Sequence, residues 1–296
     1  MNIGFMVKQI RLDKNLTQKY TASGIMNLSH YSKFERGETT TNIENFLMIL
    51  HRLNVSYEEF ILKDTSEIFM LKKGLSHDFA NAFTAGDTLK LSKIIEETSK
   101  ILENNNELAF HHLNELATVY LSLFNNGFNL ADLQGKLETI KSYLRKVNNW
   151  GIYEFVLLNN ALGTFKMNEV IYFAKKTEVQ LKKFAITDKC YIANAILYNA
   201  SLLLLEAHRF KESHKFASIS IQTAKKHANT FELIVSKITF HASAFALSLP
   251  AYHETELLKS FIALDVVDNP NFYQLIAQIC CEIIPDLEMK LQNIHI

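Results

Sequence analysis

The sequence is short of the residues that break helices. It has 296 residues but only three prolines and nine glycines, with no proline before Pro250 and no glycine after Gly163. β-Sandwiches and barrels need many glycine- and proline-containing turns, and parallel α/β folds usually need glycine after their strands. Helices need neither residue apart from occasional caps. The composition therefore predicts an all-α chain.

Other absences narrow the possible functions. Basic and acidic residues both number 31, so the net charge is zero and the chain is not uniformly basic. The three cysteines form neither a disulfide framework nor a CxxC metal motif. The most apolar stretch, residues 191–205, is too short to cross a bilayer, and the first residues lack a signal-peptide pattern. We expect a cytoplasmic protein with no membrane contact, no bound metal and no cofactor.

The motifs of common enzymes are also missing. The sequence contains no GxGxxG, P-loop, GxSxG or HExxH pattern. The neighbours His111 and His112 point to different faces of a helix and would chelate a metal poorly. We therefore expect no catalytic residues and no enzymatic activity.

The first 65 residues form a unit with its own charge pattern. Residues 1–37 carry six basic and two acidic side chains, whereas residues 38–65 carry two basic and five acidic ones. A small domain polarised in this way has one face suited to a polyanion. Apolar spacing predicts five short helices. The expected caps are Thr17, Asn27 and Ser56 for the second, third and fifth helices, and the fourth helix is expected from about Asn42 to Leu53. The buried face expected for the fourth helix consists of Ile43, Phe46, Leu47, Ile49 and Leu50.

This segment resembles the XRE-type helix-turn-helix domain. The resemblance rests on Leu-Thr-Gln at 16–18, Ser-Lys-Phe-Glu-Arg-Gly at 32–37 and Leu-Asn-Val-Ser-x-Glu-Glu-Phe at 53–60. The turn between the second and third helices is one residue shorter than the common form. Together with Ser-Lys-Phe-Glu-Arg-Gly, that shorter turn resembles the Rgg branch of Gram-positive regulators. The resemblance implies that residues 1–65 bind DNA.

The third helix is the expected recognition helix. If it starts at Asn27, its first side chains face the major groove, where Ser29 and His30 can read base edges. Gln18 begins the second helix, where it can contact a phosphate. Tyr31 and Phe34 are expected in the core. The alternative for each polar candidate is that it is an ordinary solvent-exposed surface residue without a role in DNA binding. The candidate DNA-binding residues are Arg11, Lys14, Gln18, Lys19, Leu28, Ser29, His30, Lys33 and Arg36.

Residues 66–296 change to long amphipathic helices that come in pairs. We expect five antiparallel pairs at a spacing of about 38–42 residues, then a terminal helix from Asn271 that Pro285 kinks or ends. A pair at this period cannot bury its apolar face alone, so neighbouring pairs must stack. The pattern predicts a right-handed α-solenoid of tetratricopeptide-like repeats. Its concave surface would be lined mostly by the first helix of each pair.

The middle of the chain extends the resemblance. Residues 150–154, Trp-Gly-Ile-Tyr-Glu, resemble the Trp-Gly-x-Tyr-Glu motif of Rgg-type regulators, members of the RRNPP superfamily. The resemblance then covers essentially the whole chain. It implies a homodimeric transcription regulator for quorum sensing, which binds promoter DNA and a short apolar peptide pheromone, with RNA polymerase as a further candidate partner. We expect the dimer contact at the last helices, on the stripe Ile276, Ile279 and Ile283.

Asparagines interrupt the apolar first helices and suggest where a peptide binds. A buried amide without a partner is costly, so these side chains need partners or a wet groove. Asparagine carries both a donor and an acceptor and can hold the backbone of an extended peptide. The same amides could instead hydrogen bond between helices inside the solenoid. The candidate peptide-binding residues are Tyr153, Phe155, Asn159, Asn160, Asn194, Tyr198 and Asn199.

A second function fits the same pattern. Helical repeats also bind protein segments, so the chain could be an adaptor for a protein partner, with DNA binding secondary. The two functions differ in a simple observation. A protein partner would appear in a pull-down without added peptide, whereas a peptide effector would raise the thermal stability of the protein.

Overall fold

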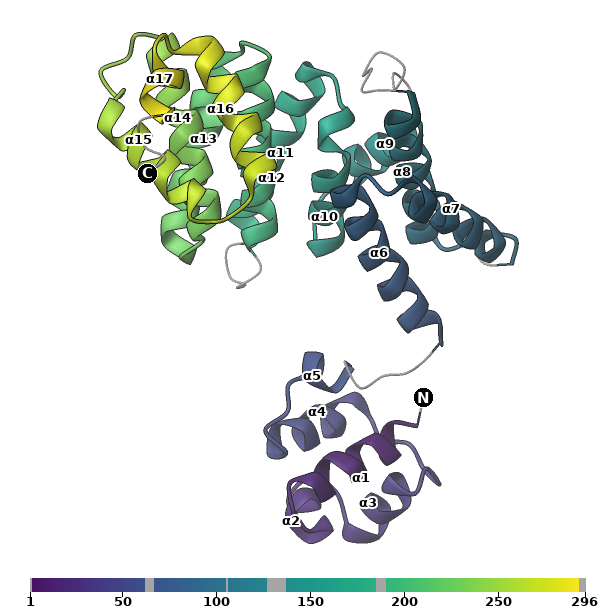
Figure 1. The fold of residues 1–296 in the computed structure, drawn as a ribbon. Coiled ribbons are helices and arrows are strands. Elements are labelled where there is room, and N and C mark those ends of the chain that lie inside the picture. Colours follow the sequence, from purple (N-terminus) through teal and green to yellow (C-terminus); the bar gives the residue numbers. More distant parts are fainter. Residues whose placement is uncertain (1, 62–66, 105, 127–136, 185–189, 293–296) are drawn as a thin grey trace. The chain divides into compact units, whose positions relative to one another are not determined.

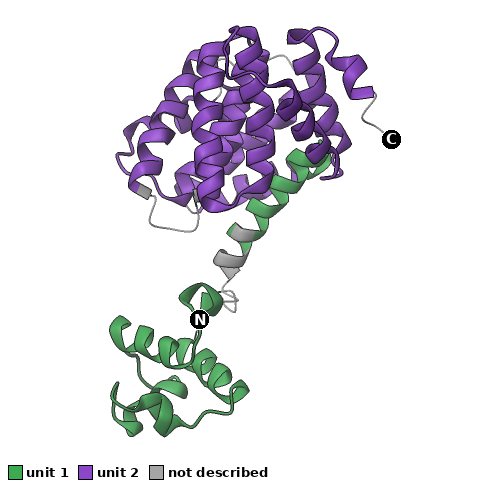
Figure 2. Ribbon diagram, turned by 90° about the vertical axis from the view of Figure 1, so that its left-hand side faces the viewer, with its two compact units in different colours: residues 1–90 green, residues 91–296 purple. Residues whose placement is uncertain are grey.

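The computed structural model describes residues 2–61, 67–104, 106–126, 137–184 and 190–292. Over these residues the chain consists of helices and contains no strand (Figure 1), which confirms the all-α prediction. The chain divides into two compact units, residues 1–90 and 91–296 (Figure 2). The domain boundary predicted at residues 65 and 66 lies outside the described residues. None of the described helices is both long and apolar enough to cross a membrane.

Five short helices form the segment that we call the head, residues 2–61. A side chain caps each of them, because Asn2, Thr17, Asn27, Asn42 and Ser56 each accept a hydrogen bond from a backbone N–H in the first helical turn. The five predicted helices and the predicted caps at Thr17, Asn27 and Ser56 are confirmed. The helices are α1 (Ile3–Asp13), α2 (Gln18–Ala22), α3 (Leu28–Glu35), α4 (Ile43–Arg52) and α5 (Tyr57–Ile61).

The head has its own apolar core, to which all five of these helices contribute. Tyr31 and Phe34 belong to it, as predicted. The fourth helix differs from its prediction, because Ile43 and Leu47 are 62% and 46% exposed. On the helical wheel these two residues lie at the edge of the apolar stripe of α4, next to the residues that are buried. That buried arc consists of Phe46, Ile49, Leu50 and Leu53.

Twelve further helices follow among the described residues, and they match the predicted pairs. The prediction that Pro285 ends the terminal helix is also confirmed, because Pro285 lies between the last two helices. A 3-10 turn at Leu162–Thr164 follows the tenth helix. The helices are α6 (Glu67–Ala85), α7 (Thr88–Leu102), α8 (Leu108–Asn126), α9 (Glu138–Lys146), α10 (Ile152–Ala161), α11 (Met167–Phe184), α12 (Cys190–Glu206), α13 (Phe210–His227), α14 (Thr230–Ala246), α15 (Glu254–Asp265), α16 (Pro270–Ile283) and α17 (Leu287–Gln292).

Within the second unit the first helices of successive pairs pack on one another. α8 contacts α10, α10 contacts α12, α12 contacts α14 and α14 contacts α16. Hydrogen bonds follow the same step, because the Tyr120 hydroxyl donates to the Asn160 carbonyl and the Asn199 amide donates to Asn159, both 40 residues apart. The turns after α12 and α14 also match, since His208 and Ser248 both have positive φ. The repeat period expected from the sequence is therefore present in the contacts.

The last helices close this stack. α16 contacts α12 as well as α14, and Ile276 and Ile279 are buried in the apolar cluster that these helices share. Ile283 is partly buried and packs against the same cluster. The stripe expected to form a dimer contact therefore faces the core of its own chain, which corrects that prediction. An apolar stripe alone does not tell whether a helix caps an array or joins two copies.

The crossing of α1 and α3 allows no side chain at Gly4. A Cβ atom built there would lie 1.8 Å from the carbonyl oxygen of Phe34. We expect Gly4→Ala to force the two helices apart and to destabilise the head by about 1–3 kcal/mol. Amide hydrogen exchange should show faster exchange in α1 and α3. The matched control is Gly74→Ala in α6, where a Cβ meets nothing within 4 Å and alanine favours the helix. Equal protection in wild type and Gly4→Ala would contradict the close approach.

Candidate functional sites

A buried ion pair joins α1 to α3 in the head. The guanidinium of Arg11 donates through Nε and Nη2 to the two carboxylate oxygens of Glu35, at 2.6 and 2.9 Å. Its Nη1 donates to the carbonyl of Leu16 at 2.7 Å, and the Gln18 side chain donates to Glu35 at 2.7 Å. Arg11 is 7% exposed and Glu35 is 1% exposed. One carboxylate thus fixes α1, the start of α2 and the end of α3.

The electrostatics of this pair exclude Arg11 from a DNA surface. Burial alone would raise the pKa of Glu35, but the hydrogen bonds from Arg11 and Gln18 outweigh it and hold the pKa below its usual value. The charge of Arg11 is neutralised inside the head and its side chain is not accessible to a phosphate. The assignment of Arg11 to the DNA surface is therefore corrected. Gln18 is half-buried and its amide nitrogen is likewise engaged by Glu35.

The N-terminal side of α3 carries accessible candidates. Leu28 is 47% exposed, Ser29 and Lys33 are exposed, and His30 is half-buried. The turn that leads into α3 contains Gly24, whose φ of 74° is costly for residues with a side chain. Between them, the turn and the Asn27 cap fix where α3 begins, so these side chains point away from the core residues Tyr31 and Phe34. The list of accessible α3 candidates is Leu28, Ser29, His30 and Lys33.

The remaining cations of the head differ in their partners. Lys14 and Lys19 are exposed, and the Lys14 ammonium lies 3.5 Å from the carbonyl of Asn54. Arg36 is exposed but forms an ion pair with Glu38 at 2.5 Å and donates to the Ser32 hydroxyl. A phosphate would have to displace Glu38 to reach Arg36. Sequence reasoning missed Arg52, which donates to the carbonyls of Tyr20 and Ser23 at 2.8 Å and so fixes the end of α2.

We call the second unit, residues 91–296, the repeat unit. Within it, residues 150–154 form a junction between four helices. The Glu154 carboxylate accepts from the Gly151 N–H at 2.7 Å and from the Tyr143 hydroxyl of α9. The backbone N–H of Trp150 donates to the Gln180 side chain of α11 at 3.1 Å, and the Trp150 ring centroid lies 5.2 Å from the Lys176 ammonium. This Trp-Gly-Ile-Tyr-Glu motif thus ties the start of α10 to both neighbouring second helices.

The same motif reaches α8 through Tyr153. The Tyr153 hydroxyl and His112 Nδ1 are hydrogen bonded at 2.7 Å. The His112 ring stacks on the Tyr153 ring with centroids 6.1 Å apart, and it lies tilted beside Tyr143 with centroids 5.0 Å apart. His112 is 1% exposed, and its burial lowers the pKa to about 4, with a smaller effect of His111. Tyr153 is 36% exposed, so its ring reaches the surface while its hydroxyl is held inside.

The predicted groove residues fall into two groups. Asn159 and Asn199 are half-buried, lie on adjacent helices and share a hydrogen bond of 3.0 Å. Asn160 and Tyr198 are also half-buried, and Tyr198 packs edge-on against Phe231 of α14. Together with Tyr153, these four keep part of their surface accessible.

Two predicted groove residues are not accessible, which corrects their assignment. Phe155 is 1% exposed and packs edge-on against Trp150, because its side of α10 faces the core. Asn194 is fully buried on α12, and neither its amide nitrogen nor its amide oxygen has a hydrogen-bond partner among the described residues. An extended peptide in a groove would not touch either side chain. Both Asn194 and Asn199 have apolar neighbours in the sequence, so the sequence could not show that Asn194 is buried and Asn199 is partly accessible.

Two family models match the chain. The model described as HTH-type transcriptional regulator Rgg, C-terminal domain, matches residues 90–277, and a helix-turn-helix model matches residues 7–60. The Rgg model alone covers more than half of the chain. The head and the repeat unit therefore correspond to two known domain types, in the order that the sequence predicts.

Solved structures share the fold over nearly the whole chain. The SHP pheromone receptor Rgg2 of Streptococcus dysgalactiae has a TM-score of 0.75 at 17% identity, covering 95% of this chain and 100% of that chain. The PrgX/cCF10 complex gives 0.70 at 15% identity, with 96% and 100% covered. PlcR of Bacillus thuringiensis in complex with the peptide PapR7 and DNA gives 0.65 at 16% identity, with 93% and 98% covered. At these identities the similarity establishes the fold alone.

The Arg11–Glu35 pair makes a prediction for stability. Glu35→Gln leaves a buried guanidinium without its counter-charge, which should destabilise the head by about 3–5 kcal/mol. Arg11→Met combined with Glu35→Met removes both charges and should cost less than either single change. Hydrogen exchange of α1 and α3 amides measures the effect. The control is Glu38→Gln, which breaks the exposed pair with Arg36 and should change protection little. Wild-type protection in Glu35→Gln would contradict this account.

His112 makes a prediction for pH dependence. Its pKa falls from an ordinary 6.5 to about 4 on folding, so below pH 6.5 the unfolded chain binds a proton that the folded chain does not. Stability of the repeat unit should therefore fall as the pH drops from about 6.5 towards 4, by up to ~3 kcal/mol. His112→Phe keeps the ring and should flatten this dependence. Urea unfolding followed by the fluorescence of the single tryptophan, Trp150, measures it.

The exposed neighbour provides the matched control for that experiment. His111→Phe also removes one histidine, but from the surface of α8 rather than from the Tyr143–Tyr153 cluster. It should keep the pH dependence of the wild type. Identical slopes of unfolding free energy against pH for His112→Phe and wild type would rule out a role of this side chain.

Proposed function

The chain belongs to the Rgg family of helix-turn-helix transcriptional regulators, and we propose that a short apolar peptide bound by its repeat unit controls how its head reads promoter DNA. The observation that carries the proposal is the combination of two surfaces in one chain. One is the accessible start of α3 on a head fixed by Arg11 and Glu35. The other is the half-buried amide pair of Asn159 and Asn199 on adjacent first helices.

The head suits recognition in the major groove. A helix-turn-helix places the start of its second helix at base edges, and Ser29 and His30 stand at that position on α3. Lys33 follows one turn later, and Lys14 and Lys19 add positive charge for phosphates. Arg11 contributes indirectly, because its bond to Glu35 fixes the angle between α1 and α3.

The amide pair suits the backbone of an extended peptide. The Asn199 amide nitrogen donates to the Asn159 oxygen. The Asn159 nitrogen and the Asn199 oxygen hydrogen bond to no other described residue, so the pair still offers one donor and one acceptor. A peptide backbone offers one acceptor and one donor per residue. Tyr153 and Tyr198 flank the pair and can hold apolar side chains. The complexes of PrgX with cCF10 and of PlcR with the peptide PapR7 give precedent on the same fold.

Two copies of the chain would act together. A single head reads one half-site, and paired heads read two half-sites about one DNA turn apart. The exposed side chains of Ile43 and Leu47 on α4 give the head an apolar surface suited to such a contact. Peptide binding would bias the repeat unit between two states that favour different spacings of the heads. This function places the protein in the cytoplasm, with RNA polymerase as a further candidate partner.

The assignment of α3 predicts two kinds of DNA-binding defect. Ser29→Ala combined with His30→Ala should lower the preference for specific over random duplexes by about tenfold or more, because base-edge contacts carry specificity. Lys14→Ala should instead weaken binding to all sequences and reduce the salt dependence by about one ion. Gel-shift competition with duplexes enriched from a randomised library measures both effects. An unchanged specificity ratio in the double variant would remove Ser29 and His30 from the interface.

The amide pair predicts a defect in peptide binding. Peptides co-purified with the protein from its native cells are identified by mass spectrometry, synthesised and titrated by fluorescence polarisation. Asn199→Ala and Asn159→Ala should each weaken binding by about tenfold, the equivalent of one hydrogen bond of 1–1.5 kcal/mol. The control is Asn148→Ala, an exposed asparagine in the α9–α10 connection. Unaltered peptide affinity in both groove variants would show that the peptide binds at another site. Recovery of a protein instead of a peptide would favour the adaptor function.

A further inference from the structure

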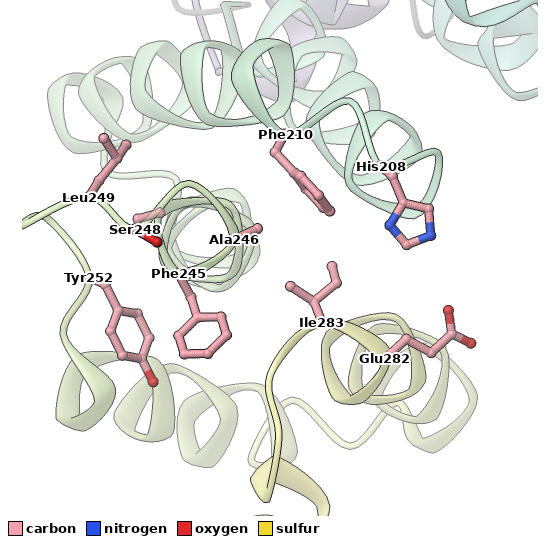
Figure 3. Close-up of a pocket in the computed structure, with 10 residues that line it drawn as sticks. His208, Phe210, Phe245, Ala246, Ser248, Leu249, Tyr252, Glu282 and Ile283 are labelled. Atoms are coloured by element: carbon pink, nitrogen blue, oxygen red, sulfur yellow. The ribbon is translucent and has the colours of Figure 1, made fainter.

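A cavity of about 560 Å³ opens at the C-terminal ends of α12, α14 and α16. None of the candidate DNA- or peptide-binding residues lines it. Its walls come from the α12–α13 turn, the last turn of α14 and the last turn of α16 (Figure 3). Cavities of this size accommodate small organic molecules. The cavity is therefore a candidate site for a ligand other than the peptide and the DNA.

The interior of the cavity is aromatic and aliphatic. Figure 3 shows Phe210 of α13 and Ile283 of α16 pointing towards each other, while Phe245 of α14 lines the cavity on the side of Tyr252. Tyr252 packs edge-on against Phe245, with ring centroids 5.2 Å apart. These side chains are partly buried and pack against the apolar cluster of the last repeats. An apolar group in the cavity would extend that cluster and be removed from water.

One mouth of the cavity is polar and carries a negative charge. His208 and Glu282 flank it from the α12–α13 turn and from α16 (Figure 3). Glu282 is exposed and forms no ion pair with any other described residue, and no lysine or arginine lines the cavity. A carboxylate without a counter-charge beside aromatic faces favours a cation, since the rings attract positive charge as well. The His208 imidazole adds ring nitrogens that can take part in a hydrogen bond.

We propose that this cavity binds a small organic amine, a primary ammonium group carried on an aromatic or branched aliphatic chain. The chain lies against Phe210, Phe245 and Ile283, and the ammonium group donates hydrogen bonds to Glu282 and His208. A ligand with a carboxylate in place of the amine meets the Glu282 charge and binds more weakly. Because the walls belong to three different helices of the stack, the bound amine also stabilises the packing of α16 on α14.

Three probes of nearly equal size test the proposal on the full chain. They are phenethylammonium, the neutral 2-phenylethanol and the anionic 3-phenylpropanoate, titrated by ligand-observed NMR. The expected order of affinity is amine, then alcohol, then carboxylate. Glu282→Gln should weaken the amine by roughly three- to fivefold and leave the alcohol unchanged, as expected for one exposed charge pair. Phe210→Ala should weaken all three, and the rise in melting temperature caused by the amine should disappear with it.

A matched control separates the site from general charge effects. Glu288→Gln removes an exposed glutamate from α17, outside this cavity, and should leave the affinity for the amine unchanged. Melting temperatures without ligand establish that both glutamine variants fold. The proposal is overturned if the amine does not saturate the protein at millimolar concentration, if the carboxylate binds as tightly as the amine, or if Glu282→Gln and Glu288→Gln behave alike.

Discussion

A helix pair of this chain cannot bury its own apolar face, and the whole repeat unit depends on the stacking that this constraint imposes. Stacking brings side chains together that are one repeat apart, as in the bonds Tyr120–Asn160 and Asn159–Asn199, each spanning 40 residues. It also explains why polar residues recur on apolar helices. They lie where one repeat meets the next, and there they can bond to a neighbour or to a ligand.

The junction at residues 150–154 shows how one short motif can hold such a stack together. Glu154 binds α9 through Tyr143, Tyr153 binds α8 through His112, and the Trp150 N–H binds α11 through Gln180. The half-buried amides of α10 begin two turns further along the same helix. A rigid start of α10 therefore positions the surface proposed for the peptide, and the ring of Tyr153 takes part in both.

The sequence was sufficient for the fold class, the five head helices, their caps and the helix pairs, because these depend on local spacing and on residues that begin or end helices. It was not sufficient for burial within a helix face. Arg11 has the charge expected of a side chain that contacts DNA, yet it is buried in an ion pair with Glu35, 24 residues away. Asn194 and Asn199 have similar neighbours in the sequence, yet only Asn199 meets the adjacent helix at the surface. The Ile276 stripe could have served a partner, but its own chain covers it. All three outcomes depend on long-range contacts that no local pattern encodes.

The central claim is that peptide and DNA are coupled through one chain. Its most direct measurement is promoter affinity at fixed salt over a titration of co-purified peptide from zero to saturation, in the wild type and in Asn199→Ala. Linkage requires that a peptide which changes DNA affinity have its own affinity changed by the same factor. The account predicts a change of about fivefold or more in the wild type, which Asn199→Ala shifts to higher peptide concentration. Promoter affinity that is identical with and without bound peptide would contradict it.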